Sequence, residues 1–127
     1  MTGSAAILLV AAALLAGCDR EPFPRLGTPV PRAIGNPQHG AELIENYGCG
    51  GCHTIRGLPG ADGVVGPPLD GIADRVYVAG MLRNTPDNLE HWIRFPQSVV
   101  PGNVMPDMGI NDADARDIAA YLYTRKD

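Results

Sequence analysis

Cys49, Cys52 and His53, in the stretch CGGCH, could do chemistry together. Two thiols three positions apart, followed directly by an imidazole, admit a zinc site, a redox dithiol or a covalent haem attachment. Zinc needs three or four protein ligands, and the other histidines, His39 and His91, form no HxxxH motif. A thioredoxin-like dithiol requires a βαβ unit, but no stretch of this chain alternates with the period of a strand.

A covalent haem fits the stretch better than either alternative. Thiols separated by two residues can add to the two vinyl groups on one edge of a porphyrin, and the adjacent histidine then meets the iron axially. Gly50 and Gly51 would let the backbone lie close to the ring. The rest of the chain must then supply a sixth ligand, and the candidates are Met105, Met108, His39 and His91. Met81 is expected to fill the core instead.

Helices are the elements that must position these residues. Apolar side chains at Leu43, Ile44 and Tyr47 predict a short helix that starts near His39 and runs into Cys49. Thr85 and Asn111 are expected to cap two further helices. The second helix follows Pro86, turns Leu89, Trp92 and Ile93 inward, and stops at Pro96. The third buries Ala115, Ile118, Ala119 and Leu122, with Arg125 and Lys126 at its negative end. The sequence therefore predicts a small all-α fold.

The N-terminus resembles the signal peptide of a bacterial lipoprotein. Residues 5 to 16 are apolar and end in LAGC, which is similar to a lipobox, although MTGSAA lacks the usual basic residue. The resemblance implies that residues 1–17 are cleaved and that Cys18 is acylated; the alternative is an uncleaved anchor with an idle Cys18. The proline-rich residues 18–38 are predicted to form a tether or, alternatively, to wrap onto the domain of residues 39–127.

Composition narrows the class of protein. A chain of 127 residues is expected to form one domain, and its formal charge of −4 without a basic run argues against a nucleic-acid partner. Aromatic residues make up 6%, while Gly 16 and Pro 12 indicate many loops. A buried macrocycle would supplement a core that is poor in large side chains.

Residues 38 to 126 resemble the class I (monohaem) cytochromes c, and look most like the cytochrome c domain of bacterial haem–copper oxidase subunit II. Three motifs carry the resemblance: GAELIENYGCGGCHTI, GPPLDGI at residues 66 to 72, and NLEHWIRFPQSVVPGNVMPDMGI. The implied fold is a small cytochrome c fold of about three main helices and short helical turns around one covalent haem c. Gly40 and Tyr121 match the positions where the first and last helices cross.

The resemblance also implies roles for site residues. Cys49 and Cys52 would form the thioethers, and His53 and Met105 would be the axial iron ligands, with Met108 as the alternative to Met105. The carbonyl of Pro67 would accept a hydrogen bond from His53. Asn103 would contact a haem propionate. Trp92 would lie in the haem pocket or, alternatively, be a core residue.

The implied function is transfer of single electrons between respiratory-chain partners, not enzymatic catalysis. Partners would include an electron donor and an electron acceptor, among them a membrane oxidase or a quinol-oxidising complex. The protein is expected at the outer face of the cytoplasmic membrane through lipid on Cys18, with its haem domain in the periplasm. Alternatives are a stably bound subunit of a terminal oxidase or dehydrogenase complex, and a haem enzyme or gas sensor in which Met105 is displaced.

Overall fold

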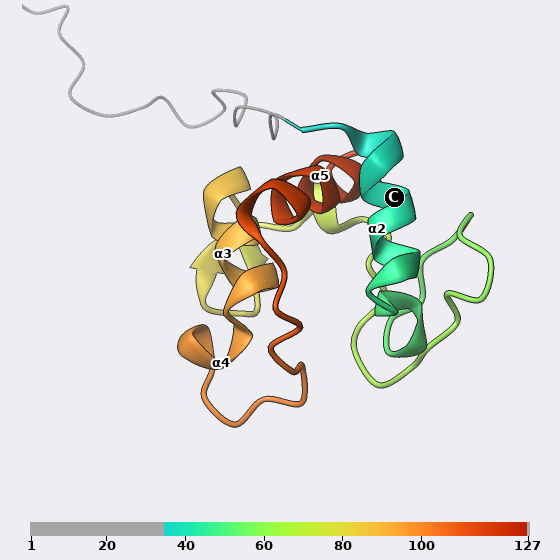
Figure 1. Cartoon of the computed structure of the whole chain (residues 1–127). Helices are drawn as coiled ribbons and strands as arrows, with labels where there is room; N and C mark the ends of the chain where they lie inside the picture. Colours follow the sequence, from blue (N-terminus) through green and yellow to red (C-terminus); the bar gives the residue numbers. More distant parts are fainter. Residues whose placement is uncertain (1–34, 127) are drawn as a thin grey trace, which may run out of the picture.

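The computed structural model describes residues 35–126. Within this range the α-helices are α2 (Pro37–Asn46), α3 (Pro86–Arg94), α4 (Pro96–Val99) and α5 (Asp112–Leu122) (Figure 1). Short 3-10 turns, η1 (Cys49–Gly51) and η2 (Ile72–Asp74), lie in the loops between them. The predicted all-α class is confirmed in its main features. The predictions for residues 1–34, which include Cys18 and most of the tether, lie outside the described residues.

Polar caps start the three longer helices. Asn36 accepts hydrogen bonds from the backbone of the first turn of α2, which begins two residues before the predicted start. Thr85 caps α3 ahead of Pro86, and Asn111 caps α5, both as predicted.

A small hairpin was not predicted. Strands β1 (Tyr77–Val78) and β2 (Leu82–Arg83) pair antiparallel, with Tyr77 opposite Arg83 and Val78 opposite Leu82. Two residues per strand are too few to produce an alternating pattern. The prediction that Met81 fills the core is wrong, because this residue lies at the turn of the hairpin and is 66% exposed.

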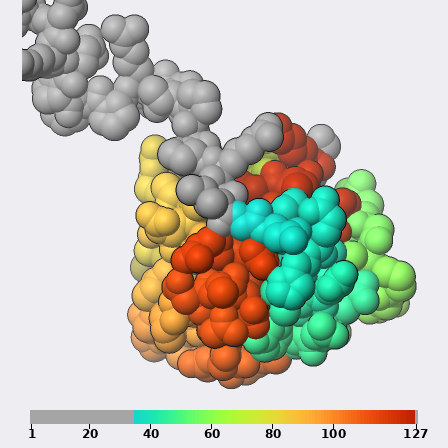
Figure 2. Space-filling model, turned by 45° about the horizontal axis from the view of Figure 1, so that its top comes forward, coloured from blue at the N-terminus to red at the C-terminus, as the bar shows by residue number. Residues whose placement is uncertain are grey.

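Helices α2 and α5 cross at very short range (Figure 2). A Cβ atom on Gly40 would lie 2.0 Å from the backbone oxygen of Asp117 and 3.0 Å from Cβ of Tyr121. The crossing therefore depends on the missing side chain at Gly40, in the place that the family resemblance implied. Tyr47 adds a second link, since its hydroxyl donates to Oδ2 of Asp114 at 2.7 Å.

The start of the described chain is fastened to α5. The N–H of Asn36 donates to Oδ1 of Asp117 at 2.7 Å, and Nδ1 of His39 lies 2.8 Å from Oδ2 of the same carboxylate. A Cβ atom on Gly35 would lie 2.6 Å from the backbone oxygen of Arg116, so the chain enters flat against the helix.

The His39–Asp117 pair predicts a pH dependence of stability. The hydrogen bond to Asp117, helped by nearby Glu42 and Asp114, raises the pKa of His39 above its usual 6.5. The stabilisation is therefore complete below about pH 6.5 and is lost as the pH rises through the raised folded-state pKa. Urea unfolding across this range should show a fall in unfolding free energy that is absent in His39→Gln. The same fall in the variant would contradict the assignment.

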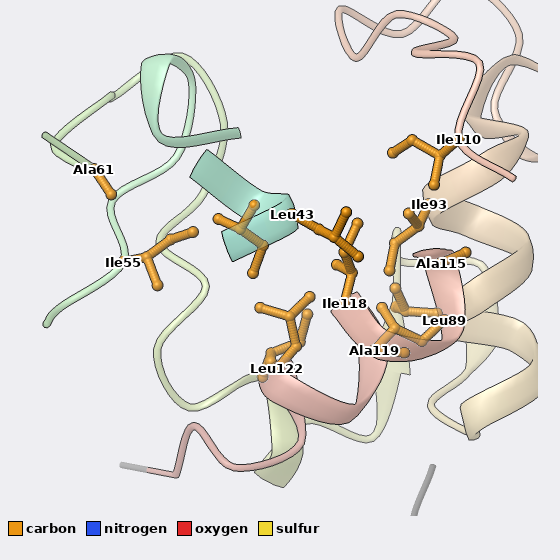
Figure 3. Close-up of a cluster of buried hydrophobic side chains, with 13 residues drawn as sticks. Leu43, Ile55, Ala61, Leu89, Ile93, Ile110, Ala115, Ile118, Ala119 and Leu122 are labelled. Carbon is orange, nitrogen blue, oxygen red and sulfur yellow. The ribbon is translucent and has the colours of Figure 1, made fainter. Parts of the chain in front are cut away.

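One hydrophobic core joins the helices to the loop that follows α2. Figure 3 shows side chains of α5 between Ile55 on one side and Leu89 and Ile93 of α3 on the other. The α5 contribution is Ala115, Ile118, Ala119 and Leu122, as predicted. Because Ile55 follows His53 by two residues, the core also fixes the loop that carries the candidate site.

The two buried polar side chains of the described region are satisfied. Asp70 accepts from the N–H of Arg56 at 3.0 Å and from the guanidinium of Arg125 at 3.2 Å. Burial raises the pKa of Asp70, but these bonds and charges outweigh it and hold the pKa below its usual range. Asn84 donates to two backbone carbonyls and accepts from the hydroxyl of Tyr123. The C-terminal segment is thereby tied to the loops.

Candidate functional site

The CGGCH stretch forms a tight turn at the end of α2. Gly48, at φ 72°, lets the chain leave the helix, and the N–H groups of Cys52 and His53 then both donate to the carbonyl of Cys49. Cys49 is partly buried and Cys52 is exposed, and both thiols are free. Burial raises the pKa of the Cys49 thiol. A reactive redox dithiol needs a lowered thiol pKa, so this environment disfavours the dithiol alternative.

A backbone ladder joins this turn to the GPPL motif. Hydrogen bonds run from Gly63 N–H to Gly50 O at 3.0 Å, from Gly66 N–H to Cys52 O at 2.8 Å, and from Leu69 N–H to Thr54 O at 2.9 Å. Thr54 Oγ1 also donates to Gly63 O at 2.9 Å. The segment of residues 63–69 is therefore fixed in register along residues 50–54.

The ladder brings a carbonyl onto the imidazole. Nδ1 of His53 lies 2.7 Å from the backbone oxygen of Pro67. Since a carbonyl can only accept, Nδ1 carries a proton in this bond, and in the neutral imidazole the lone pair is then on Nε2. This is the hydrogen bond that the resemblance implied, and it orients the ring as ligating histidines are oriented.

Gly66 is a site residue that the sequence did not single out. A Cβ atom there would lie 2.3 Å from Cε1 and 2.7 Å from Nδ1 of His53. Only glycine lets the chain pass so close to the imidazole. Its place directly before Pro67 in GPPL was the available signal.

The methionine candidates lie in the loop between α4 and α5. Met105 is partly buried, and Met108 is 39% exposed. Figure 1 places this loop and the CGGCH turn on the same side of α5. Both segments are thus presented on one side of the helical layer.

Asn103 has partners within its own loop. Its amide nitrogen donates to the carbonyls of Pro96 at 3.0 Å and Val100 at 2.6 Å, and its oxygen accepts from the N–H of Met105 at 2.7 Å. Both amide protons are engaged with backbone, so a contact with a propionate stays a prediction.

The remaining candidates lie apart from the turn. Trp92 is partly buried and packs against the hydrophobic core. His91 is exposed, with its ring 5.5 Å from that of Phe95, and His39 pairs with Asp117. Lys126 is exposed, and Arg125 lies beyond the last residue of α5. The prediction that these two residues complement the end of that helix is wrong for Arg125, which binds Asp70.

The donor set suits haem iron and not zinc. Within residues 35–126 no group of three or more histidine, cysteine or acidic side chains is arranged to hold a metal ion. An imidazole whose Nδ1 is bonded to a carbonyl, two free thiols at the attachment spacing and the methionines of the loop between α4 and α5 match the ligand chemistry of a c-type haem.

Comparison with known proteins agrees with this chemistry. The cytochrome c family model matches residues 37–126. The chain is 41% identical over 90 residues to cytochrome c oxidase subunit 2 of Alkalihalophilus pseudofirmus, covering 68% of this chain but 25% of that protein. It is 41% identical over 66 residues to the subunit 2 of Bacillus sp. (strain PS3), covering 50% of this chain and 18% of that one.

A smaller relative is matched along nearly its whole length. The chain is 35% identical over 101 residues to cytochrome c2 of Rhodoblastus acidophilus, covering 69% of this chain and 91% of that protein. The chain thus spans about a quarter of the length of the A. pseudofirmus oxidase subunit but nearly all of cytochrome c2. It belongs to the cytochrome c family and carries covalently bound haem c.

Proposed function

We propose that this cytochrome is a membrane-anchored monohaem carrier that passes single electrons between respiratory-chain partners. The observation that carries the proposal is the His53–Pro67 hydrogen bond, which leaves Nε2 of His53 available to iron. Cys49 and Cys52 would form the thioethers, and Met105 would be the sixth ligand. The haem supplies a reversible one-electron change at its iron.

Binding of the haem iron by both His53 and Met105 would favour a carrier over an enzyme. The two ligands together would leave no open coordination position, and methionine ligation would raise the reduction potential. In the alternative, a haem enzyme or gas sensor, Met105 would leave the iron. Binding of carbon monoxide by the native ferrous protein would favour that alternative.

Anchoring rests on the N-terminal signal. Lipid on Cys18 would hold the protein at the outer face of the cytoplasmic membrane of a bacterium, with the haem domain in the periplasm. No helix among residues 35–126 has the length and apolar character needed to cross a membrane. Mass spectrometry of the mature protein tests the anchor, and an unmodified Cys18 would contradict it.

A second candidate is a fixed subunit of an oxidase complex. The 41% identity to cytochrome c oxidase subunit 2 favours it. Mild detergent solubilisation followed by native electrophoresis with haem staining distinguishes a mobile carrier from a fixed subunit. Migration alone supports a mobile carrier, and migration with an oxidase supports a fixed subunit. A mobile carrier with formal charge −4 should meet a basic partner surface, at rates that fall as salt rises.

The covalent attachment has a direct test. The pyridine haemochrome spectrum of the purified protein should show thioether-linked haem that acid–acetone does not extract. Extractable haem would contradict attachment at Cys49 and Cys52.

We expect different results from the two methionines. The weak long-wavelength methionine-to-iron absorption band should disappear completely in Met105→His, since imidazole then replaces the thioether. It should persist in Met108→Leu, which serves as the matched control. Loss of the band in Met108→Leu alone would assign the sixth ligand to Met108.

A further inference from the structure

The loop that carries Met105 is held by two side-chain amides. Gln97 lies in α4, and both the oxygen and the nitrogen of its side-chain amide form hydrogen bonds to this loop. Its oxygen accepts from the N–H of Gly102 at 3.0 Å, and its nitrogen donates to the carbonyls of Asn103 at 3.0 Å and Met105 at 2.7 Å.

Asn103 completes the arrangement from inside the loop. It accepts from the N–H of Met105 and donates back to the carbonyls of Pro96 and Val100. Both backbone polar groups of Met105 are thus bonded to side-chain amides, the N–H to Asn103 and the carbonyl to Gln97. We call these two side-chain amides, of Gln97 and Asn103, the brace. Asn103 bonds the carbonyl of Pro96, which is fully buried, so the brace is attached to a fixed point of the fold.

The loop has few other means of holding its shape. Pro101 and Pro106 have no N–H group to donate, and residues 103–111 form no helix or strand. The next regular element is α5, which starts at Asp112. A thioether is a weak ligand for iron, so its occupancy depends on how firmly the protein holds it in place.

We propose that Gln97 and Asn103 are positioning residues that hold Met105 at the iron by restraining both backbone groups of that residue. The proposal rests on the assignment of Met105 as the sixth ligand. Each amide opposes opening of the loop, and so opposes replacement of the thioether by another ligand. Gln97 is the sharper test, because it is exposed and lies outside the loop.

Competition with imidazole measures this restraint. Imidazole added to the ferric holoprotein displaces Met105, and the loss of the methionine-to-iron band reports the displacement. In Gln97→Ala the imidazole concentration at half-displacement should fall about three- to tenfold, the size expected for a lost net hydrogen bond. Amide hydrogen exchange at Gly102, followed by NMR, should accelerate in the same variant.

Two further variants sharpen the comparison. Gln97→Glu keeps the side-chain length and the acceptor for Gly102, but its carboxylate faces the carbonyls of Asn103 and Met105. It should ease displacement at least as much as Gln97→Ala. Gln38→Ala removes an exposed glutamine from the start of α2 and should leave the half-displacement concentration unchanged.

The outcomes separate this proposal from the one on which it rests. A methionine band that is absent from the wild-type protein overturns the ligand assignment itself. If the wild-type protein shows the band but both Gln97 variants have the same half-displacement concentration as the wild type, the role of the brace is overturned and the ligand assignment stands. Equal sensitisation by Gln38→Ala also overturns it, because the effect would then be unspecific.

Discussion

Gly40→Ala should destabilise the protein, although the same change stabilises most helices. Alanine is favoured over glycine in a helix interior by about 1 kcal/mol. Here the new Cβ would lie 2.0 Å from the backbone oxygen of Asp117, and a backbone atom cannot move aside without shifting α5. We expect the unfolding free energy to fall by about 2–3 kcal/mol or more.

Guanidinium unfolding of the holoprotein, followed by circular dichroism, measures this effect. Glu42→Ala is the matched control, since Glu42 is exposed on the same helix. It should change the unfolding free energy by no more than about 0.5 kcal/mol. A Gly40→Ala protein as stable as the wild type would show that the two helices do not cross as closely as described.

Gly66→Ala should weaken the binding of haem iron by His53, which we propose as a ligand. The added methyl group would overlap the imidazole, and the main chain cannot retreat, because Gly66 N–H is bonded to Cys52 O. The ring must turn, which breaks its hydrogen bond to Pro67 and moves Nε2. Loss of such an orienting contact lowers metal affinity about 10–100-fold.

An acid titration makes this loss visible. Protonation competes with iron for Nε2, so the pH at which the low-spin spectrum is lost should rise by about one to two units. Val64→Ala is the control, because that side chain is 88% exposed in the same loop. An unchanged acid midpoint in Gly66→Ala would mean that the ring tolerates a side chain at this position.

Local signals in the sequence predicted the helices well. Thr85 before Pro86 and Asn111 before two aspartates are short-range capping patterns, and the structure uses both. The apolar spacing in α5 is also a short-range signal, because residues three and four positions apart share a helix face, and it identified the buried face of α5. The hydrogen bond between Pro67 and His53 was predicted from the GPPL motif through the family resemblance, and not from the local pattern around either residue.

Contacts between distant segments could not be predicted in this way. Arg125 and Asp70 are joined only once the chain has folded back, and neither lies in a pattern that indicates a partner. Gln97 looks like an ordinary exposed glutamine until the loop after it closes over its amide. The hairpin strands have two residues each, too few for an alternating pattern. The sequence therefore gives no sign that Met81 lies at an exposed turn and not in the core.

The contacts of Gly35 and Asn36 with α5 fix the side of that helix on which the described chain begins. The chain enters beside α5, whereas the CGGCH turn and the Met105 loop extend from the other side of that helix (Figure 1). The point where residue 35 enters the domain and the segments with the proposed iron ligands therefore lie on different sides of α5, so the entering chain leaves the proposed haem side of α5 uncovered at this point.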